Sequence, residues 1–403
     1  MAMEENRKKQ LIESLLTRGM ENIIPGKEKL LELLSSGKVL NVYMGIDPTA
    51  TRIHLGHAFG LRKLQIMANL GHQVTFLIGD FTAKIGDTSD KETERPILTD
   101  EEIKINFETY KRQAEKFLDF SIVKVVHNSE WLSKLNFGDI LGIAKNFSLN
   151  DFISRELIKK RLTKGERVSL PETIYPLMQG YDSYHLDADI QFGGTDQTFN
   201  MQAGRTLQKN LRNKEMVVVA NGFLPGTDGR KMSKSWGNAV WIEDSPEDVY
   251  GKIMSIADEV ILTYFEMGTN ADMGVIEEVK ERLAQKENPM ILKKELAKLV
   301  VEELHGFMAV KQAEDHFQKT VVEKTAGEET KEVKVEYPLA VMGGENSLMA
   351  VLLDNRLVSS NSEFKILLSE GAIYLDEVRL VREQTILAPG TIRVGKRKYL
   401  KLI

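Results

Sequence analysis

A short basic segment in the middle of the chain carries side chains suited to phosphate chemistry. It reads Lys231-Met232-Ser233-Lys234-Ser235, so two ammonium groups lie three residues apart beside two small hydroxyls. Gly229 and Gly237 flank the segment and favour a loop that can move. Because lysine binds phosphate as a long-reach point charge, the segment is suited to a triphosphate. The alternative is a solvated basic loop.

A second candidate phosphate site lies far upstream, at His54-Leu55-Gly56-His57. Residues 39–46 are mostly apolar and β-branched or aromatic, which predicts a buried strand, and Asp47-Pro48 ends it. From Leu55 onward apolar residues recur at helical spacing until Gly71, which fits the C′ position. The histidines therefore fall at a helix start, where backbone amides and imidazole donors favour an anion. A purely structural role for each histidine is the alternative.

The two segments together resemble the two nucleotide-binding motifs of the class I aminoacyl-tRNA synthetases, with Leu55 where isoleucine is common. Three further segments resemble the bacterial-type tyrosyl-tRNA synthetase family: residues 43–50 its opening strand and loop, 175–182 its substrate helix and 193–197 its ribose-binding segment. The resemblance extends over the whole chain and is densest from residue 43 to residue 256.

Three polar residues indicate an amino-acid pocket. Tyr175, Gln179 and Asp182 have the spacing i, i+4 and i+7, so they share one face of a helix. The alternative is that Tyr175 packs in a core while the other two face water. The resemblance implies that Tyr175 and Gln179 hold a substrate ammonium together with Asp87, and that Asp182 and Tyr43 bind a phenolic hydroxyl. Such a polar pair would reject phenylalanine, because the missing hydroxyl leaves buried groups unpaired.

The resemblance also implies a set of nucleotide contacts. Asp196 would accept from the ribose hydroxyls, with Gln197 near the substrate carboxylate; a loop that caps a helix is the alternative. Asp47 is left between the ribose region and a network around the substrate amine, and Thr49 could reach a phosphate. The predicted ATP contacts are Asp47, Thr49, His54, Gly56, His57, Gly194, Asp196, Lys231, Met232, Ser233 and Lys234. Of these, His54, His57, Lys231 and Lys234 are predicted to be catalytic.

One segment departs from the family pattern. Thr88-Ser89-Asp90-Lys91 stands where the family usually has Pro-Ser-Gly-Lys after its Ile-Gly-Asp. Loss of the proline and glycine changes the turn chemistry of this loop, although Asp87 itself is retained.

Composition narrows the classes of protein. A length of 403 residues with 42% hydrophobic content predicts two or three packed domains. No apolar run approaches 18 residues and the N-terminus lacks a signal-peptide pattern, so we expect no membrane association and a cytoplasmic protein. The absence of cysteine excludes disulfides and Cys-ligated zinc. A net charge of −5 argues against a DNA-coating protein and restricts RNA contacts to local basic patches.

The predicted fold class is α/β, with a doubly wound parallel-sheet (Rossmann-like) catalytic domain over residues 1–240. Strands at 74–78 and 122–126 alternate with a helix opened by a capping box at Thr99 and Glu102. In such sheets ligands bind at the carboxyl ends of the strands. A helical insertion at about 128–170 corresponds, by the resemblance, to a homodimer interface; from the sequence alone it could equally be an ordinary helical excursion.

The rest of the chain is predicted to hold two further domains. Ser245 caps the first helix of an all-helical region, 241–322, which the resemblance assigns to anticodon recognition. Residues 323–338 read as an exposed linker. Residues 339–403 contain two helices, short strands and a basic end, and resemble the alpha-L RNA-binding motif; a basic tail without a partner is the alternative.

The resemblance thus predicts an enzyme that activates L-tyrosine with ATP and transfers it to tRNA(Tyr). Mg²⁺ would travel with ATP, without a dedicated protein site. Two alternatives remain open. A tryptophanyl-tRNA synthetase-like enzyme shares the fold but should lack the Tyr43 and Asp182 pair. An RNA-binding splicing scaffold derived from a synthetase would not need the two nucleotide motifs.

Overall fold

The computed structural model describes residues 2–87, 98–232, 236–322, 332–344, 347–358, 360–376, 378–382, 384–395 and 398–403. Of the predicted features, Ser233, Lys234, the departing segment at residues 88–91 and residues 323–331 of the predicted linker lie outside these ranges. The chain forms two compact units, Met1–Val310 and Lys311–Ile403, and each is described by itself.

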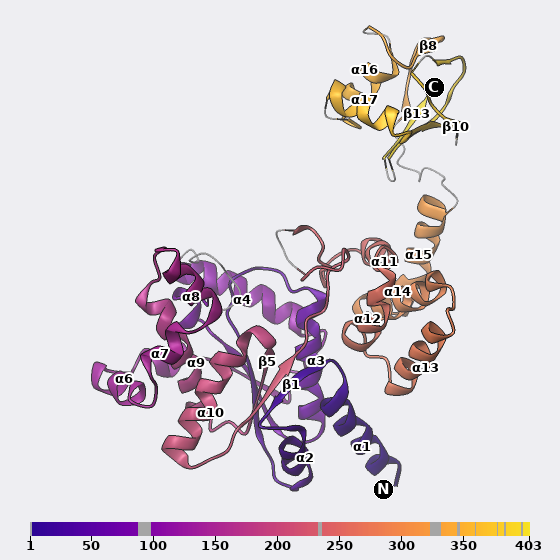
Figure 1. Cartoon of the computed structure of the whole chain (residues 1–403). Helices are drawn as coiled ribbons and strands as arrows, with labels where there is room; N and C mark the ends of the chain where they lie inside the picture. The colour runs from indigo at the N-terminus through magenta and orange to yellow at the C-terminus, as the bar shows by residue number, and fades with distance from the viewer. Residues whose placement is uncertain are drawn as a thin grey trace. The chain divides into compact units, whose positions relative to one another are not determined.

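A six-stranded sheet forms the centre of the first unit (Figure 1). Its order is β1-β6-β5-β2-β3-β4, from β1 (Met20–Ile24), β2 (Asn41–Ile46), β3 (Gln73–Ile78), β4 (Val123–His127), β5 (Ile190–Gly194) and β6 (Val217–Asn221). Five strands are parallel, which confirms the predicted sheet, and β1 is an antiparallel edge strand that the sequence analysis did not locate. The predicted strands at 39–46, 74–78 and 122–126 match β2, β3 and β4 to within two residues.

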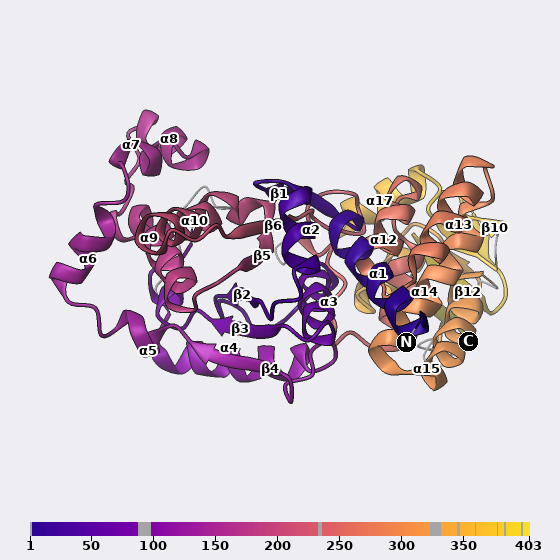
Figure 2. The same cartoon turned by 90° about the horizontal axis from the view of Figure 1, so that it is seen from below.

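The order of the strands reverses between β2 and β5. Helix α3 (Leu55–Asn69) lies on one face of the sheet, and α9 (Leu170–His185) and α10 (Thr198–Arg212) lie on the other, as Figures 1 and 2 show. At such a switch point the connections leave in opposite directions and open a crevice at the carboxyl ends of the strands. The fold therefore places the residues after β2 and β5 at the edge where ligands bind.

The remaining helices of this part follow the sequence signals. Helix α4 (Asp100–Ala114) begins at the predicted capping box, in which the Glu102 amide donates to Thr99. Helices α1 (Ala2–Thr17) and α2 (Lys27–Ser35) precede the first parallel strand and had no counterpart in the sequence analysis. The predicted helical insertion consists of α5 (Ser129–Leu132), α6 (Phe137–Ala144), α7 (Leu149–Ile153) and α8 (Glu156–Thr163).

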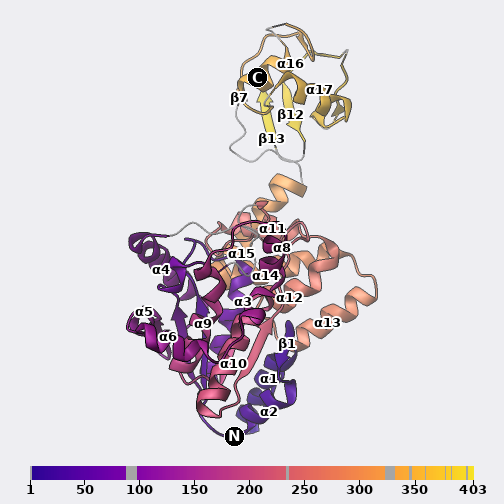
Figure 3. The same cartoon turned by 60° about the vertical axis from the view of Figure 1, so that its left-hand side comes forward.

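The region after residue 241 is helical, as predicted. It contains α11 (Pro246–Met254), α12 (Ile261–Gly268), α13 (Met273–Ala284), α14 (Pro289–His305) and α15 (Phe307–Phe317), seen from another side in Figure 3. Ser245 caps α11 by accepting from the Asp248 amide. This region packs against the sheet-bearing part within the same compact unit up to Val310.

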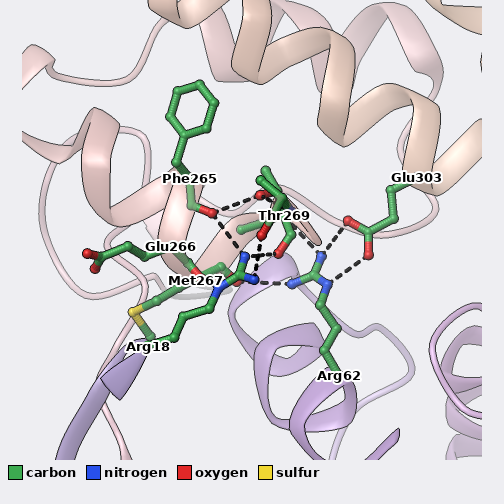
Figure 4. A network of polar contacts seen from close by, with 9 residues as sticks. Arg18, Arg62, Phe265, Glu266, Met267, Thr269 and Glu303 are labelled. Carbon is green, nitrogen blue, oxygen red and sulfur yellow. Dashed lines mark hydrogen bonds and ion pairs between the residues drawn. The ribbon is translucent and has the colours of Figure 1, made fainter. Parts of the chain in front are cut away.

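A buried network of cations ties the helical region to α3 (Figure 4). Arg62 of α3 donates to both carboxylate oxygens of Glu303 in α14, at 2.7 and 2.9 Å, and to the carbonyls of Met267 and Gly268. Arg18, just after α1, donates to four carbonyls between residues 265 and 271. The guanidinium groups thus satisfy the carbonyls at the end of α12, which would otherwise be left without partners.

The second unit is a small α+β structure. Helices α16 (Leu348–Asp354) and α17 (Asn361–Ser369) accompany a sheet of order β10-β9-β12-β13-β7, from β10 (Val378–Arg379), β9 (Ile373–Leu375), β12 (Gly390–Val394), β13 (Lys398–Leu402) and β7 (Glu332–Val333). A short pair, β8 (Leu339–Ala340) and β11 (Thr385–Ile386), completes the unit. The short strands expected in this domain include a hairpin of β9 and β10, with Leu375 opposite Val378.

Strand pairing in this unit changes the bounds of the predicted linker and argues against the alternative of a basic tail. Strand β7 pairs with β13, so Glu332 and Val333 belong to the sheet although the predicted linker, 323–338, includes them. The basic end is not a tail, because it forms β12 and β13. Within it Arg393 lies over the Tyr374 ring, and Lys401 pairs with Glu332 at 2.7 Å.

Candidate active site

One cavity of about 800 Å³ collects the predicted site residues. It lies at the carboxyl ends of the strands on either side of the switch point and has the size of ordinary ligand pockets. It is lined, among others, by Tyr43, Asp47, Thr49, His54, Gly56, His57, Asp87, Tyr175, Gln179, Asp182, Gly194, Asp196, Gln197, Lys231 and Met232. Every candidate that the structure describes is therefore in the same cavity, although the candidates come from five separate segments of the chain.

The two histidines stand at the start of α3, as the sequence predicts. His54 is the N-cap residue and its ring stacks on that of His57, with the centroids 3.7 Å apart. The His54 amide donates to His57 Nδ1 at 3.3 Å, so a neutral His57 carries its proton on Nε2.

Their environment keeps both rings neutral. Burial, the neighbouring His57 ring and the charge of Lys231 lower the pKa of His54 to about 2. Burial and the charge of Lys231 lower the pKa of His57 to about 4. At neutral pH both imidazoles are uncharged hydrogen-bond partners at the positive end of a helix, an arrangement that favours an anion.

Lys231 faces the predicted ribose-binding residue across the cavity. Its Nζ lies 3.7 Å from Asp196 Oδ2 and 4.4 Å from the centroid of the Phe223 ring. Just before Lys231, the Asp228 carboxylate accepts from Asn238 Nδ2 at 2.8 Å and from Arg230. These hydrogen bonds lower the pKa of Asp228 to about 2. These contacts fix the loop that precedes the basic segment, and Lys231 lines the cavity.

Asp47 lies against Tyr175 of α9. The Tyr175 hydroxyl donates to Asp47 Oδ2 at 2.9 Å, and the Thr82 hydroxyl donates to Asp47 Oδ1 at 2.7 Å. A Cβ on Gly79 would lie 2.0 Å from that same Oδ1, so no other residue fits at this position without displacing the carboxylate. Both oxygens of Asp47 therefore accept hydrogen bonds from hydroxyl groups, one of which belongs to the predicted amino-acid pocket.

Asp182 is fully buried at the other end of the polar face of α9. Its Oδ1 accepts from Trp131 Nε1 at 2.7 Å and its Oδ2 from Asn128 Nδ2 at 3.2 Å. Burial nevertheless raises the pKa of Asp182 to about 8, against the lowering effect of these two bonds. The Tyr43 hydroxyl lies 2.6 Å from Ser183 Oγ. This end of the cavity is a buried polar surface that carries little negative charge at neutral pH.

Asp87 and Gln197 are in direct contact. Gln197 Nε2 donates to Asp87 Oδ2 at 2.6 Å, and Gln197 Oε1 accepts from Asn200 Nδ2 at 3.0 Å. The contact joins the segment after β3 to the segment after β5, whose residues are separated by more than 100 positions.

Comparison with known proteins identifies the family. The model of the family described as tRNA synthetases class I (W and Y) matches residues 35–322. The chain belongs to the class I tRNA synthetases. The curated tyrosine–tRNA ligase of Carboxydothermus hydrogenoformans is 42% identical over 405 residues, covering 98% of each chain. That of Thermotoga maritima is 37% identical and covers 96% of each chain.

Solved structures agree with this family. The tyrosyl-tRNA synthetase of Archaeoglobus fulgidus, solved as a complex with L-tyrosine, superimposes with a TM-score of 0.60 at 26% identity, covering 76% of this chain and 98% of that one. A truncated mitochondrial tyrosyl-tRNA synthetase of Aspergillus nidulans has the same fold, with a TM-score of 0.64 at 23% identity. The described part of this class I synthetase thus shares its fold with solved tyrosyl-tRNA synthetases.

Four residues that contact the predicted site residues of this synthetase were not predicted from the sequence. Thr82 and Asn128 lie just after β3 and β4, and Trp131 and Ser183 are buried beside Asp182. Polar residues directly after parallel strands are a usable signal for the first two. The indole and the buried serine give no such signal, because their roles depend on contacts between distant segments.

Neither a metal site nor a membrane span is found in the described part of the synthetase. There, no cluster of three or more His, Cys, Asp or Glu side chains has a geometry suited to a metal ion. Within the same ranges, every helix is too short or too polar to cross a membrane.

Proposed function

We propose that this protein activates L-tyrosine with ATP to form tyrosyl-adenylate and then transfers the tyrosyl group to tRNA(Tyr). The observation that carries the proposal is the single cavity in which a phosphate-binding end, at His54, His57 and Lys231, meets a buried polar end on α9. The relatives named tyrosine–tRNA ligase support tyrosine as the substrate.

In the first half-reaction a tyrosine carboxylate oxygen attacks the α-phosphorus of ATP, and pyrophosphate leaves. The chain supplies positioning and charge stabilisation, not a covalent nucleophile. The neutral histidines donate to phosphate oxygens, and Lys231 supplies positive charge to the leaving pyrophosphate, together with Lys234. Mg²⁺ enters as part of the ATP substrate.

The contacts of Asp47 favour one of the two roles that the sequence left open, the one near the substrate ammonium. Its carboxylate bonds to the Tyr175 hydroxyl, so we assign Asp47 to the network around the substrate ammonium, with Tyr175, Gln179 and Asp87. The phenolic hydroxyl then lies at Asp182 and Tyr43. Asp196 is assigned to the ribose and Gln197 to the region of the substrate carboxylate.

In the second half-reaction a terminal ribose hydroxyl of the tRNA attacks the carbonyl carbon of tyrosyl-adenylate, and AMP leaves. We assign no protein base to this step. The helical region, 241–322, and the C-terminal domain, 339–403, are proposed to bind the tRNA. In the C-terminal domain the partners of Arg393, Lys398 and Lys401 within the chain favour a surface shaped by the fold over a free basic tail.

The insertion, 128–170, is proposed to form a homodimer interface. Phe137 of α6 and Leu149 of α7 are 75% and 66% exposed, and Leu141 of α6 and Leu162 of α8 are also exposed. These exposed apolar side chains on short helices are the kind of surface that a protein interface covers. Analytical ultracentrifugation of the wild type and of Phe137→Ser/Leu149→Ser tests it: a monomeric wild type contradicts the interface.

The test of the enzymatic proposal is ATP–pyrophosphate exchange on the purified protein with tyrosine, phenylalanine and tryptophan in parallel. Exchange that depends on tyrosine alone is expected. Exchange with tryptophan would overturn the assigned substrate, and no exchange with any of the three would favour an RNA-binding scaffold.

A further inference from the structure

A buried serine beneath the polar end of the cavity has no role in the reaction described above. Ser183 is inaccessible to solvent, and its Oγ lies 2.6 Å from the Tyr43 hydroxyl. It also donates to Gln191 Oε1 at 3.2 Å. Tyr43 and Gln191 are register partners on the adjacent parallel strands β2 and β5. Their side chains therefore leave the same face of the sheet side by side, beneath α9.

The number of protons on these groups fixes the direction of the bonds. A serine hydroxyl has one proton to donate. Because Ser183 gives that proton to Gln191, the contact with Tyr43 requires Tyr43 to donate and Ser183 to accept. The Tyr43 proton is then turned toward α9, and the lone pairs of its oxygen remain for a partner in the cavity.

The surroundings of Ser183 hold its hydroxyl in this position. Gln208 Nε2 donates to the Ser183 carbonyl at 3.0 Å, which anchors the residue near the end of α9. A Cβ on Gly204 of α10 would lie 2.2 Å from Ser183 Oγ. Since a contact that short is impossible, the glycine leaves the space that the hydroxyl occupies. Sheet, α9 and α10 thus each contribute to the placement of one oxygen atom.

We propose that Ser183 is a positioning residue for substrate selection: by taking the proton of Tyr43, it presents the Tyr43 oxygen as an acceptor for the phenolic O–H of tyrosine. Phenylalanine has no such proton, so this hydrogen bond to the Tyr43 oxygen can form only with tyrosine. The inference rests on the proposed function, which places the phenolic end of tyrosine at Tyr43 and Asp182.

The experiment measures kcat/KM for tyrosine and for phenylalanine by ATP–pyrophosphate exchange in the full-length protein. Ser183→Ala is expected to lower the tyrosine/phenylalanine ratio about fivefold, the effect of one net hydrogen bond, with the KM for ATP unchanged. Ser14→Ala, at a buried serine of α1 away from the cavity, is the matched control and should keep the wild-type ratio.

A double-mutant cycle separates positioning from a purely structural role. If Ser183 acts through Tyr43, Ser183→Ala should cause no further loss of the ratio in a Tyr43→Phe background. Gly204→Ala, which displaces the Ser183 hydroxyl without removing it, should resemble Ser183→Ala. An equal loss in both backgrounds, or an unchanged ratio in Ser183→Ala, overturns the inference. If Tyr43→Phe itself leaves the ratio unchanged, the assigned orientation of the substrate fails instead.

Discussion

The substitution Glu303→Gln tests the buried network that joins α14 to α3. Glu303 is the carboxylate that pairs with Arg62, and the two side chains are 13% and 6% exposed. Removal of one partner from a buried ion pair costs about 3–5 kcal/mol, because the remaining charge is left without compensation. We expect the low end, about 3 kcal/mol, since the glutamine oxygen still accepts one of the two Arg62 hydrogen bonds.

The expected loss of unfolding free energy corresponds to a decrease in melting temperature. Unfolding entropy of about 2.1 cal/mol/K per residue over the 310 residues of the first unit gives roughly 0.65 kcal/mol/K. A loss of 3 kcal/mol therefore lowers the melting temperature of this unit by about 5 °C. The chain has three tryptophans, at positions 131, 236 and 241, all within this unit, so tryptophan fluorescence follows its unfolding alone.

A matched control lies on the same helix. Glu295 of α14 pairs with Arg282 at 2.8 Å, but its side chain is 43% exposed. Glu295→Gln should cost less than about 1 kcal/mol, or at most 1–2 °C, because water screens exposed pairs. Equal shifts for the two variants would refute the reasoning from burial. Below the melting temperature Glu303→Gln should retain pyrophosphate exchange, because Glu303 does not line the cavity.

Three further predictions concern the site. Lys231→Ala should slow pyrophosphate exchange about 10²-fold while tyrosine affinity, measured by equilibrium dialysis, is unchanged; an equal loss of affinity would argue against a role at the pyrophosphate. Asp182, whose pKa is raised from 3.8 to about 8 by burial, stays protonated in the folded protein where it would ionise in the unfolded chain. The melting temperature of the wild type should therefore fall relative to that of Asp182→Asn as the pH rises from about 4 to about 8. Fluorescence melting curves of the two proteins measure this difference. A difference that does not change with pH would contradict the raised pKa of Asp182. Truncation after residue 322 should leave exchange intact and weaken tRNA charging; undiminished charging would remove the C-terminal domain from tRNA binding.

Local signals predicted much of this fold because the relevant interactions are short in sequence. The Thr99 capping box, Gly71 at the end of α3 and the start of α11 at Ser245 each depend on a few neighbouring residues, and the structure contains all three. The edge strand β1 could not be found this way. Its residues, Met-Glu-Asn-Ile-Ile, lack a clear alternation, and its position is set by pairing with β6 about 200 residues later.

In the candidate site, too, local patterns were predictable from the sequence, whereas contacts between distant segments were not. Spacing on one helix predicted that Tyr175 and Asp182 share a face, and both line the cavity. The place of Asp47 could not be decided from sequence, because it depends on a hydrogen bond from Tyr175, which lies 128 residues away. The supporting side chains of Asn128 and Trp131 were missed for the same reason.

The distribution of charge in the cavity provides a physical reason for the proposed orientation of the substrate. Asp182 is neutral at pH 7, because its pKa is about 8. Asp47 accepts hydrogen bonds from two hydroxyl groups, and Asp87 accepts one from the Gln197 amide. An ammonium group is therefore attracted to the Asp47 and Asp87 end, whereas a neutral phenol can be buried against Asp182 without a charge to desolvate. Since Tyr175 and Asp182 are seven residues apart, the two ends are separated by roughly 10 Å along α9. In the proposed function, similar carboxyl groups therefore take different roles because their surroundings differ. A tyrosine bound in the opposite direction would place its ammonium beside the neutral Asp182.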